Sequence, residues 1–142
     1  MKVLIWHCAK FRLGNINHSH RIKAIDHRNN DISEQNVIVP WITVESEKDI
    51  FFLDDVIQEI ENMSITYNTK LVVITPFGHL SNTHCNKKKA YEILQTLTQR
   101  LEDKMFAAQL AHFGSYKDIE FLSEAHPEQV KFRTYPKPVH AE

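Results

Sequence analysis

The chain has 142 residues, a net charge of −1, 42% hydrophobic residues and 25% charged residues. These values are ordinary for a globular protein and suit one domain over residues 1–142, and they exclude a global basic field for nucleic acid. Two cysteines, Cys8 and Cys85, are too few for a disulfide framework. The N-terminal apolar run Val3–Trp6 is too short for a signal or a membrane span, so we expect a cytoplasmic protein with no membrane association.

The first half of the chain predicts strands followed by a helix. Val3–Trp6 suits a short buried strand, and a weaker strand signal lies near Arg21–Ile25. Asn36–Glu45 is rich in β-branched and aromatic residues, which favours a strand, and Pro40 in its middle argues for an edge position or a bulge. Glu47–Met63 has apolar residues at helical spacing, which predicts a helix.

The second half predicts a central strand, a helix and three more strands. Leu71–Thr75 is an apolar run typical of a strand buried on both faces, and Pro76 ends it because proline has no N–H to donate. Asn86–Lys104 has a helical apolar stripe. Two strands, Phe106–Phe113 and Tyr116–Phe121, are expected to form a hairpin around Gly114-Ser115. A last strand is expected at Val130–Thr134, before a tail that starts at Pro136.

Helices that alternate with strands indicate the α/β class, with a mixed β-sheet covered by about two helices. Right-handed crossovers should make part of the sheet parallel. The residues just past the central strand, Phe77–Ser81, include a glycine, an imidazole and a hydroxyl. Polar groups at the carboxyl end of a buried strand are where α/β proteins commonly bind ligands, so this stretch is the first candidate site.

Several blocks resemble the N-terminal editing domain of archaeal threonyl-tRNA synthetases. Pro76-Phe77-Gly78-His79-Leu80-Ser81 resembles the Pro-Phe-Ala-His-Leu-Ser block of that family. The segment from His112 to Lys117 is similar to its Pro-Phe-Gly-Tyr-Tyr-Lys. Met1-Lys2-Val3-Leu4 and Ala125-His126-Pro127 also resemble family positions, and the matches occur in the same order and at similar spacing.

The resemblance implies a D-aminoacyl-tRNA deacylase-like fold, a homodimer, and removal of serine mischarged onto threonine tRNA. It assigns functional roles to Lys117, His79 and Tyr116. Substrate-binding positions follow at two sets of residues: Val44, Pro76, Phe77, Gly78 and Leu80, and then Gly114 and Ser115. The family relies on the 2′-hydroxyl of the tRNA and on main-chain groups, so no catalytic nucleophile, metal or cofactor is expected, and the implied partner is the 3′ end of the tRNA.

The chain departs from the family pattern at several positions. Gly78 stands where the family has alanine, and Ser115 stands where it has an aromatic residue. A family glutamate that follows the His-Pro pair falls at Val130 by counting, and the nearby Glu128 is not aligned with it. The aminoacylation and anticodon-binding regions are absent from this sequence, so we expect a freestanding editing factor or an excised domain.

The residues themselves allow plainer interpretations. Lys117 could be a solvated lysine that protects a sheet edge, His79 could cap a loop, and Tyr116 could pack its ring with its hydroxyl exposed. Lys87-Lys88-Lys89 could contact tRNA phosphates or form a solvated helix face. The nine histidines, including His18 and His20, lack a familiar zinc spacing.

Two functions from different classes remain. The first is an aminoacyl-tRNA editing hydrolase, which the combination of His79, Tyr116 and Lys117 favours. The alternative is a non-catalytic module of the same fold that binds an amino acid or a tRNA end, which the departures at Gly78 and Ser115 favour.

Overall fold

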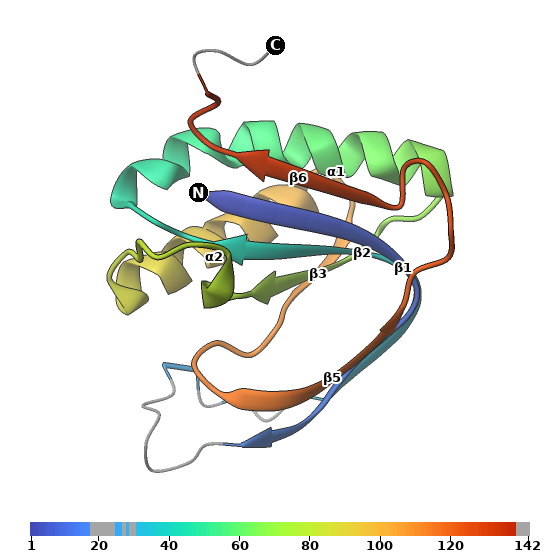
Figure 1. Ribbon diagram of the computed structural model, residues 1–142, viewed down its shortest axis with the longest axis horizontal. Helices are drawn as coiled ribbons and strands as arrows, with labels where there is room; N and C mark the ends of the chain where they lie inside the picture. Colours follow the sequence, from blue (N-terminus) through green and yellow to red (C-terminus); the bar gives the residue numbers. More distant parts are fainter. Residues whose placement is uncertain (18–24, 27, 29–30, 139–142) are drawn as a thin grey trace.

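In the computed structural model, which describes residues 1–17, 25–26, 28 and 31–138, six strands form one mixed sheet and two α-helices cover one face of it (Figure 1). In chain order the strands are β1 Lys2–Asn17, β2 Ile32–Thr43, β3 Leu71–Pro76, β4 Ala107–Leu110, β5 Tyr116–Leu122 and β6 Val130–Thr134. The helices are α1 Leu53–Tyr67 and α2 Lys87–Asp103, and two short 3-10 helices are η1 Glu47–Phe52 and η2 Gly78–Leu80. The predicted α/β class, with a mixed sheet covered by two helices, is confirmed.

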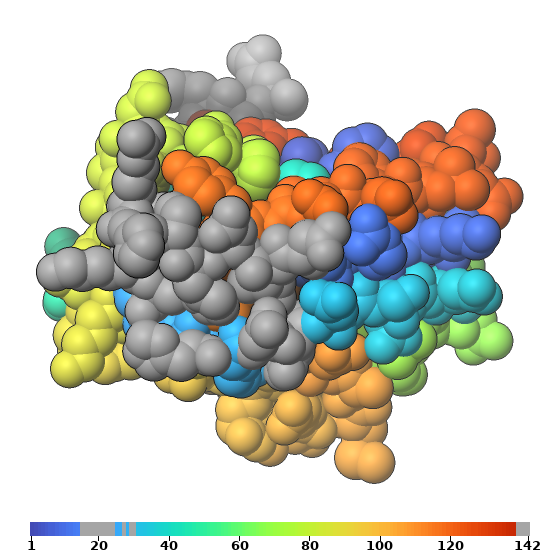
Figure 2. Space-filling view, turned by 90° about the horizontal axis from the view of Figure 1, so that it is seen from below, coloured from blue at the N-terminus to red at the C-terminus, as the bar shows by residue number. Residues whose placement is uncertain are grey.

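The strand order is β4-β3-β2-β1-β5, and β6 pairs with β1 as well. The pairs β2–β3 and β3–β4 are parallel, as expected for strands joined through α1 and α2, whereas β1 runs antiparallel to β2, β5 and β6. Figure 2 shows β5, β1 and β2 side by side as orange, blue and cyan bands. The predicted parallel part of the sheet is therefore confirmed.

The two faces of the central strands are both apolar. Ile38 and Ile42 of β2 belong to the same buried cluster as the apolar sides of α1 and α2. The alternate residues Val39 and Trp41 belong to a second cluster on the opposite face, together with Val73 of β3. Burial on both faces explains why β2 and β3 read as continuous apolar runs.

The first strand is much longer than the predicted Val3–Trp6. Its first half pairs with β6 and its second half with β5, and it curves away from the helices between these two parts (Figure 1). The partner strand β2 correspondingly starts at Ile32 rather than at the predicted Asn36. The strand expected near Arg21–Ile25 lies outside the described residues, apart from Ile25.

The predicted hairpin between Phe106–Phe113 and Tyr116–Phe121 is wrong. β4 pairs with β3 at one edge of the sheet, whereas β5 pairs with β1 on the other side. The crossover through α2 places β4 beside β3, and the chain then crosses the end of the sheet through residues 111–115. Gly114 has a φ of 81° and bends this crossing segment instead of closing a hairpin.

The predicted edge position for Pro40 is also wrong, because β2 lies inside the sheet between β1 and β3. The β2–β3 ladder keeps one register but has no pair between Ile38 and Trp41, so the missing proline N–H is accommodated by a gap. The predicted helix at Glu47–Met63 begins as η1, where Ser46 and Asp49 form a capping box, and α1 then continues to Tyr67. In the described part of the chain, neither helix is long and apolar enough to span a membrane.

Candidate functional site

A cavity of about 460 Å³ opens at the end of the sheet where β3 finishes. Its walls come from the end of β2, the loop after β3, the start of α2, and residues 112–117 with Ile119. A cavity of this size is within the usual range for a small-molecule site. The chain crossing that replaced the predicted hairpin therefore brings the two motif segments together, although β3 and β5 are not neighbours in the sheet.

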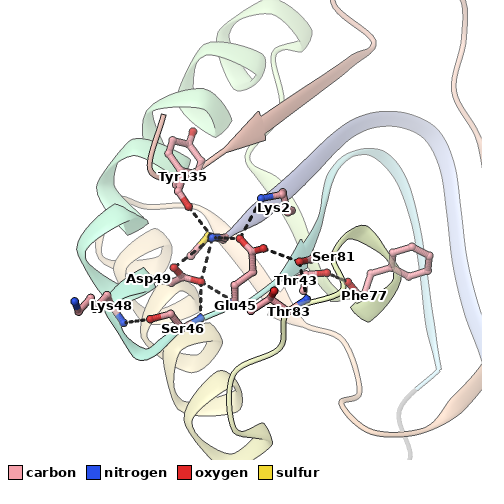
Figure 3. A network of polar contacts seen from close by, with 11 residues as sticks. Lys2, Thr43, Glu45, Ser46, Lys48, Asp49, Phe77, Ser81, Thr83 and Tyr135 are labelled. Carbon is pink, nitrogen blue, oxygen red and sulfur yellow. Dashed lines mark hydrogen bonds and ion pairs between the residues drawn. The ribbon is translucent and has the colours of Figure 1, made fainter. Parts of the chain in front are cut away.

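The loop after Pro76 is held to the end of β2. The Phe77 N–H donates to the Ile42 carbonyl oxygen at 2.9 Å, and the Thr43 hydroxyl donates to the Phe77 carbonyl oxygen (Figure 3). The Phe77 ring meets the Trp41 ring edge-on, with 4.7 Å between the ring centroids. These contacts explain how a loop that has left the sheet can still present its residues at a fixed place.

Glu45 connects the same loop to the chain's amino terminus (Figure 3). Its Oε1 accepts a hydrogen bond from the Met1 ammonium at 2.6 Å, and its Oε2 accepts one from the Ser81 hydroxyl at 2.6 Å. The Met1 ammonium also donates to the Tyr135 carbonyl oxygen at 2.7 Å and lies 3.3 Å from a carboxylate oxygen of Asp49. Burial alone would raise the pKa of Glu45, but the hydrogen bonds from Met1 and Ser81 lower it to about 2.

Lys117 contributes a half-buried ammonium group to the cavity. Burial lowers the pKa of Lys117, because the charged form loses hydration. Its Nζ donates to the Ser115 carbonyl oxygen at 3.3 Å, and it has no ion pair with any residue that the structure describes. A cation that is partly dehydrated and not neutralised by a carboxylate can stabilise negative charge on a bound molecule.

His79 and His84 stand beside Gly78 on the loop side of the cavity. His79 is exposed, and its ring lies edge-on to the Phe77 ring at 5.2 Å. His84 Nε2 is 2.7 Å from the Gly78 carbonyl oxygen, which fixes the second imidazole on the backbone. A Cβ added at Gly78 would lie 3.7 Å from His84 Nε2, an ordinary contact distance, so a methyl group at this position of the cavity wall would fit beside the His84 ring.

The structure brings the proposed functional residues His79, Tyr116 and Lys117 to this one cavity. The proposed substrate-binding positions Val44, Pro76, Phe77, Gly78, Gly114 and Ser115 line it as well.

Leu80 does not line the cavity, because its side chain packs against the apolar cluster on the face opposite the helices. Glu128 and Val130 are also absent from the cavity wall. Glu128 pairs with Lys131 at 3.3 Å, and Val130 pairs with Trp6 in the sheet.

Sequence reasoning did not place several polar residues in this wall, among them His84 and His112, and it considered Lys87 only as a contact for tRNA phosphates. His84 and Lys87 follow closely on the first motif, so a wider window after Pro76 would have included them. His112 is the first residue of the second motif and is buried, and its contact with Ser115 in the folded chain shows that it belongs to the site. Cys85 lines the cavity too, and burial raises the pKa of its thiol.

Metal-binding side chains do not converge in the part of the chain that the structure describes: no group of three or more His, Cys, Asp or Glu residues is placed to hold an ion. His18 and His20, which were weighed as possible zinc ligands from the sequence, lie outside the described residues.

Comparison with known proteins gives consistent matches. The family model described as the Archaea-specific editing domain of threonyl-tRNA synthetase matches residues 1–134. The chain is 29% identical over 140 residues to a threonine–tRNA ligase of Nanoarchaeum equitans, an alignment that covers 88% of this chain and 22% of that protein. It is 33% identical over 96 residues to a threonine–tRNA ligase editing subunit of Saccharolobus solfataricus, covering 68% of this chain and 25% of that protein. The chain thus spans about a quarter or less of the length of these curated relatives.

The fold also matches a solved structure. The c-Myc DNA unwinding element binding protein superposes with a TM-score of 0.69 at 10% sequence identity, covering 96% of this chain and 99% of that chain. At this identity the likeness shows the fold alone. The D-aminoacyl-tRNA deacylase-like fold that the resemblance implied is confirmed.

Proposed function

Because the chain belongs to the Archaea-specific editing-domain family of threonyl-tRNA synthetase, we propose that it is an aminoacyl-tRNA deacylase that removes mischarged serine from threonine tRNA. The proposed reaction is hydrolysis of the ester between the amino acid and the terminal ribose of the tRNA. The observation that best supports this proposal is the ammonium of Lys117, which has no carboxylate partner among the described residues and lies in the same cavity as His79 and Tyr116.

Ester hydrolysis needs a site that stabilises the oxyanion formed when the carbonyl carbon is attacked. We assign this role to Lys117, whose ammonium is less hydrated than a surface lysine. His79 and the exposed Tyr116 are assigned to holding the terminal ribose and the amino acid. Val44 and the main chain from Pro76 to Gly78 line the same cavity, and we assign them to binding the rest of the terminal nucleoside.

The proposal is tested by deacylation of Ser-tRNA(Thr), with Thr-tRNA(Thr) and a D-aminoacyl-tRNA as comparison substrates. Loss of one oxyanion-stabilising group costs on the order of 10²–10³ in rate, so we expect Lys117→Met to lose activity by that factor. Lys10→Met removes an exposed lysine of β1 outside the cavity and is the matched control. If the intact protein binds charged tRNA but hydrolyses none of these substrates, it is the binding module instead.

We also propose that the protein works as a homodimer. Large apolar side chains are exposed on β5 and β6: Phe121 is 42% exposed and Phe132 50%. Phe121 packs on Trp6 and Trp41, with ring centroids 5.5 and 5.7 Å apart, so it continues the apolar cluster of the sheet face opposite the helices. A second copy would cover this surface. Light scattering should give twice the chain mass of 16.6 kDa, and a monomer mass at micromolar concentration would reject the dimer.

A further inference from the structure

A serine and a histidine meet in the wall of the cavity. Ser115 Oγ and His112 Nδ1 are joined by a hydrogen bond of 2.7 Å, and both residues line the cavity. His112 is only 4% exposed, so its ring is confined, whereas Ser115 is half-buried. Gly114, with its φ of 81°, turns the chain between them and lets side chains three residues apart face each other. A hydroxyl within hydrogen-bond reach of an imidazole is the basic arrangement of an activated serine.

A buried carboxylate is held at the end of β4, the strand that leads to His112. Asp26 is 4% exposed, and both its carboxylate oxygens accept hydrogen bonds from Arg28 Nε at 2.8 Å. Arg28 also donates to the Leu110 carbonyl oxygen at 3.1 Å, which holds this pair against the end of β4, two residues before His112. Burial alone would raise the pKa of Asp26, but the hydrogen bonds and charge of Arg28, and then the charge of His112, lower it, so this carboxylate is ionised in its pair with Arg28.

The third requirement is a donor for the developing oxyanion. Lys117 Nζ lies 3.3 Å from the main-chain carbonyl oxygen of Ser115, so the ammonium is next to the residue that carries the hydroxyl. We propose that Ser115 is a nucleophile, with His112 as its general base and Lys117 beside it as the oxyanion cation. This inference rests on the proposed deacylase function for its natural substrate, but the pair itself should react with any small ester that enters the cavity.

The proposed reaction has two steps, acylation of Ser115 and hydrolysis of the acyl-serine. Ser115 Oγ attacks the carbonyl carbon of the aminoacyl ester while His112 Nδ1 takes the hydroxyl proton. The bond between that carbon and the ribose oxygen then breaks, and His112 returns the proton to the ribose oxygen, which leaves as the tRNA hydroxyl. Water then attacks the carbonyl carbon of the aminoacyl-serine ester while His112 takes its proton, the bond from that carbon to Ser115 Oγ breaks, and His112 returns the proton to Oγ as the amino acid leaves.

The pair is a property of this chain rather than of the family pattern. In the family's Pro-Phe-Gly-Tyr-Tyr-Lys block, the positions of His112 and Ser115 hold proline and tyrosine, and neither the base nor the aliphatic hydroxyl would be present. A covalent route would therefore add to this chain a nucleophile that the resemblance did not imply.

The test uses the purified full chain with 4-nitrophenyl acetate as a small ester and Ser-tRNA(Thr) as the proposed substrate. We expect a burst of nitrophenol and an acetyl group on Ser115, found by peptide mass spectrometry. Ser115→Ala should abolish both, and His112→Asn, which can still accept a hydrogen bond from the serine but is no base, should slow the burst by more than about 10³-fold. Ser123→Ala, a serine outside the cavity, is the control.

The outcomes separate this inference from the proposed function. If Ser115→Ala deacylates Ser-tRNA(Thr) as fast as the intact protein, or the acetyl group is found on Lys117 or Cys85 and not on Ser115, the nucleophile is refuted while the deacylase function stands. If Ser115 is acetylated but no charged tRNA is hydrolysed, the nucleophile stands and the proposed function fails. Circular dichroism of each variant verifies that the fold is intact.

Discussion

Glu45 and Ser81 are joined by a hydrogen bond of 2.6 Å, and the same carboxylate binds the Met1 ammonium at 2.6 Å through its other oxygen. One side chain therefore couples the start of β1 to the loop that carries His79, although these segments are far apart in the sequence (Figure 3). The stability of the fold and the placement of the loop should depend on the charge of Glu45.

We predict that Glu45→Gln destabilises the protein at neutral pH by on the order of 2 kcal/mol. The pKa of Glu45 is lowered from 4.5 to about 2, so the ionised form of this carboxyl group is more strongly favoured in the folded protein than in the unfolded chain. The stabilisation is therefore fully present above about pH 4.5 and is lost as the pH falls toward 2.

Urea unfolding of the intact protein and Glu45→Gln at pH 7 and at pH 3 measures this effect. The difference in unfolding free energy should shrink at the lower pH. Glu124→Gln, an exposed carboxylate without a partner among the described residues, is the control and should change little at either pH. An equal difference at both values would show that the charge of Glu45 is not the source of the stability.

Lys117 should show a trade-off between stability and activity. Its pKa is lowered by burial, so the folded state binds the proton less well than the unfolded chain does, and keeping the ammonium at neutral pH costs stability. This cost is present below the folded-state pKa and disappears as the pH rises above the unfolded value. We therefore predict that Lys117→Met raises the urea midpoint at pH 7 while it removes deacylation.

The same shift predicts a pH dependence of catalysis. The rate of deacylation, corrected for spontaneous ester hydrolysis, should fall as the pH rises. The fall should begin at a pH below 10.5, the ordinary pKa of lysine, because the lowered pKa of Lys117 makes its ammonium lose the proton at a lower pH. The urea midpoints of Lys117→Met and the intact protein should converge in alkaline solution. A Lys117→Met protein that is less stable at pH 7 would show that Lys117 is a structural residue.

The regular elements were largely predictable because their signals are local. The apolar stripe of α2 and the end of β3 at Pro76 follow from spacing and from the missing proline N–H. The hairpin was mispredicted because the Gly114-Ser115 pair satisfies a local turn rule, while the position of β4 is set by its crossover from β3. His112 was missed for a similar reason, since its meaning depends on the folded contact with Ser115.

Gly78 should widen the substrate range of the cavity. An added methyl would meet His84 at 3.7 Å without a clash, and Gly78 has no left-handed backbone conformation, so Gly78→Ala should fold normally. The methyl would fill part of the space that the extra methyl group of threonine could use. One methylene-sized difference is worth about 1–3 kcal/mol, so we expect the ratio of Ser-tRNA(Thr) to Thr-tRNA(Thr) deacylation to rise by roughly tenfold or more.

Steady-state kinetics on both substrates measures this ratio, and each substrate is the internal control for the other. If Gly78→Ala slows both reactions equally, the methyl blocks the cavity and does not select between side chains. An unchanged ratio at full activity would place the amino-acid side chain away from this wall.

Lys87 and Lys88 should contact the tRNA backbone. They lie in the first turn of α2, where positive charge opposes the helix dipole, and Lys87 lines the cavity. Neutralising them should therefore weaken tRNA binding while leaving the helix as stable or slightly more stable. Each phosphate contact adds about 0.7–0.9 to the slope of log affinity against log salt concentration. We predict that the Lys87→Gln/Lys88→Gln double variant lowers this slope by about 1–2 in fluorescence-polarisation titrations.

Lys104→Gln removes an exposed lysine just past the opposite end of the same helix and should leave the slope unchanged. If both variants keep the slope of the intact protein, the lysines are a solvated helix face and the tRNA approaches the cavity from another side.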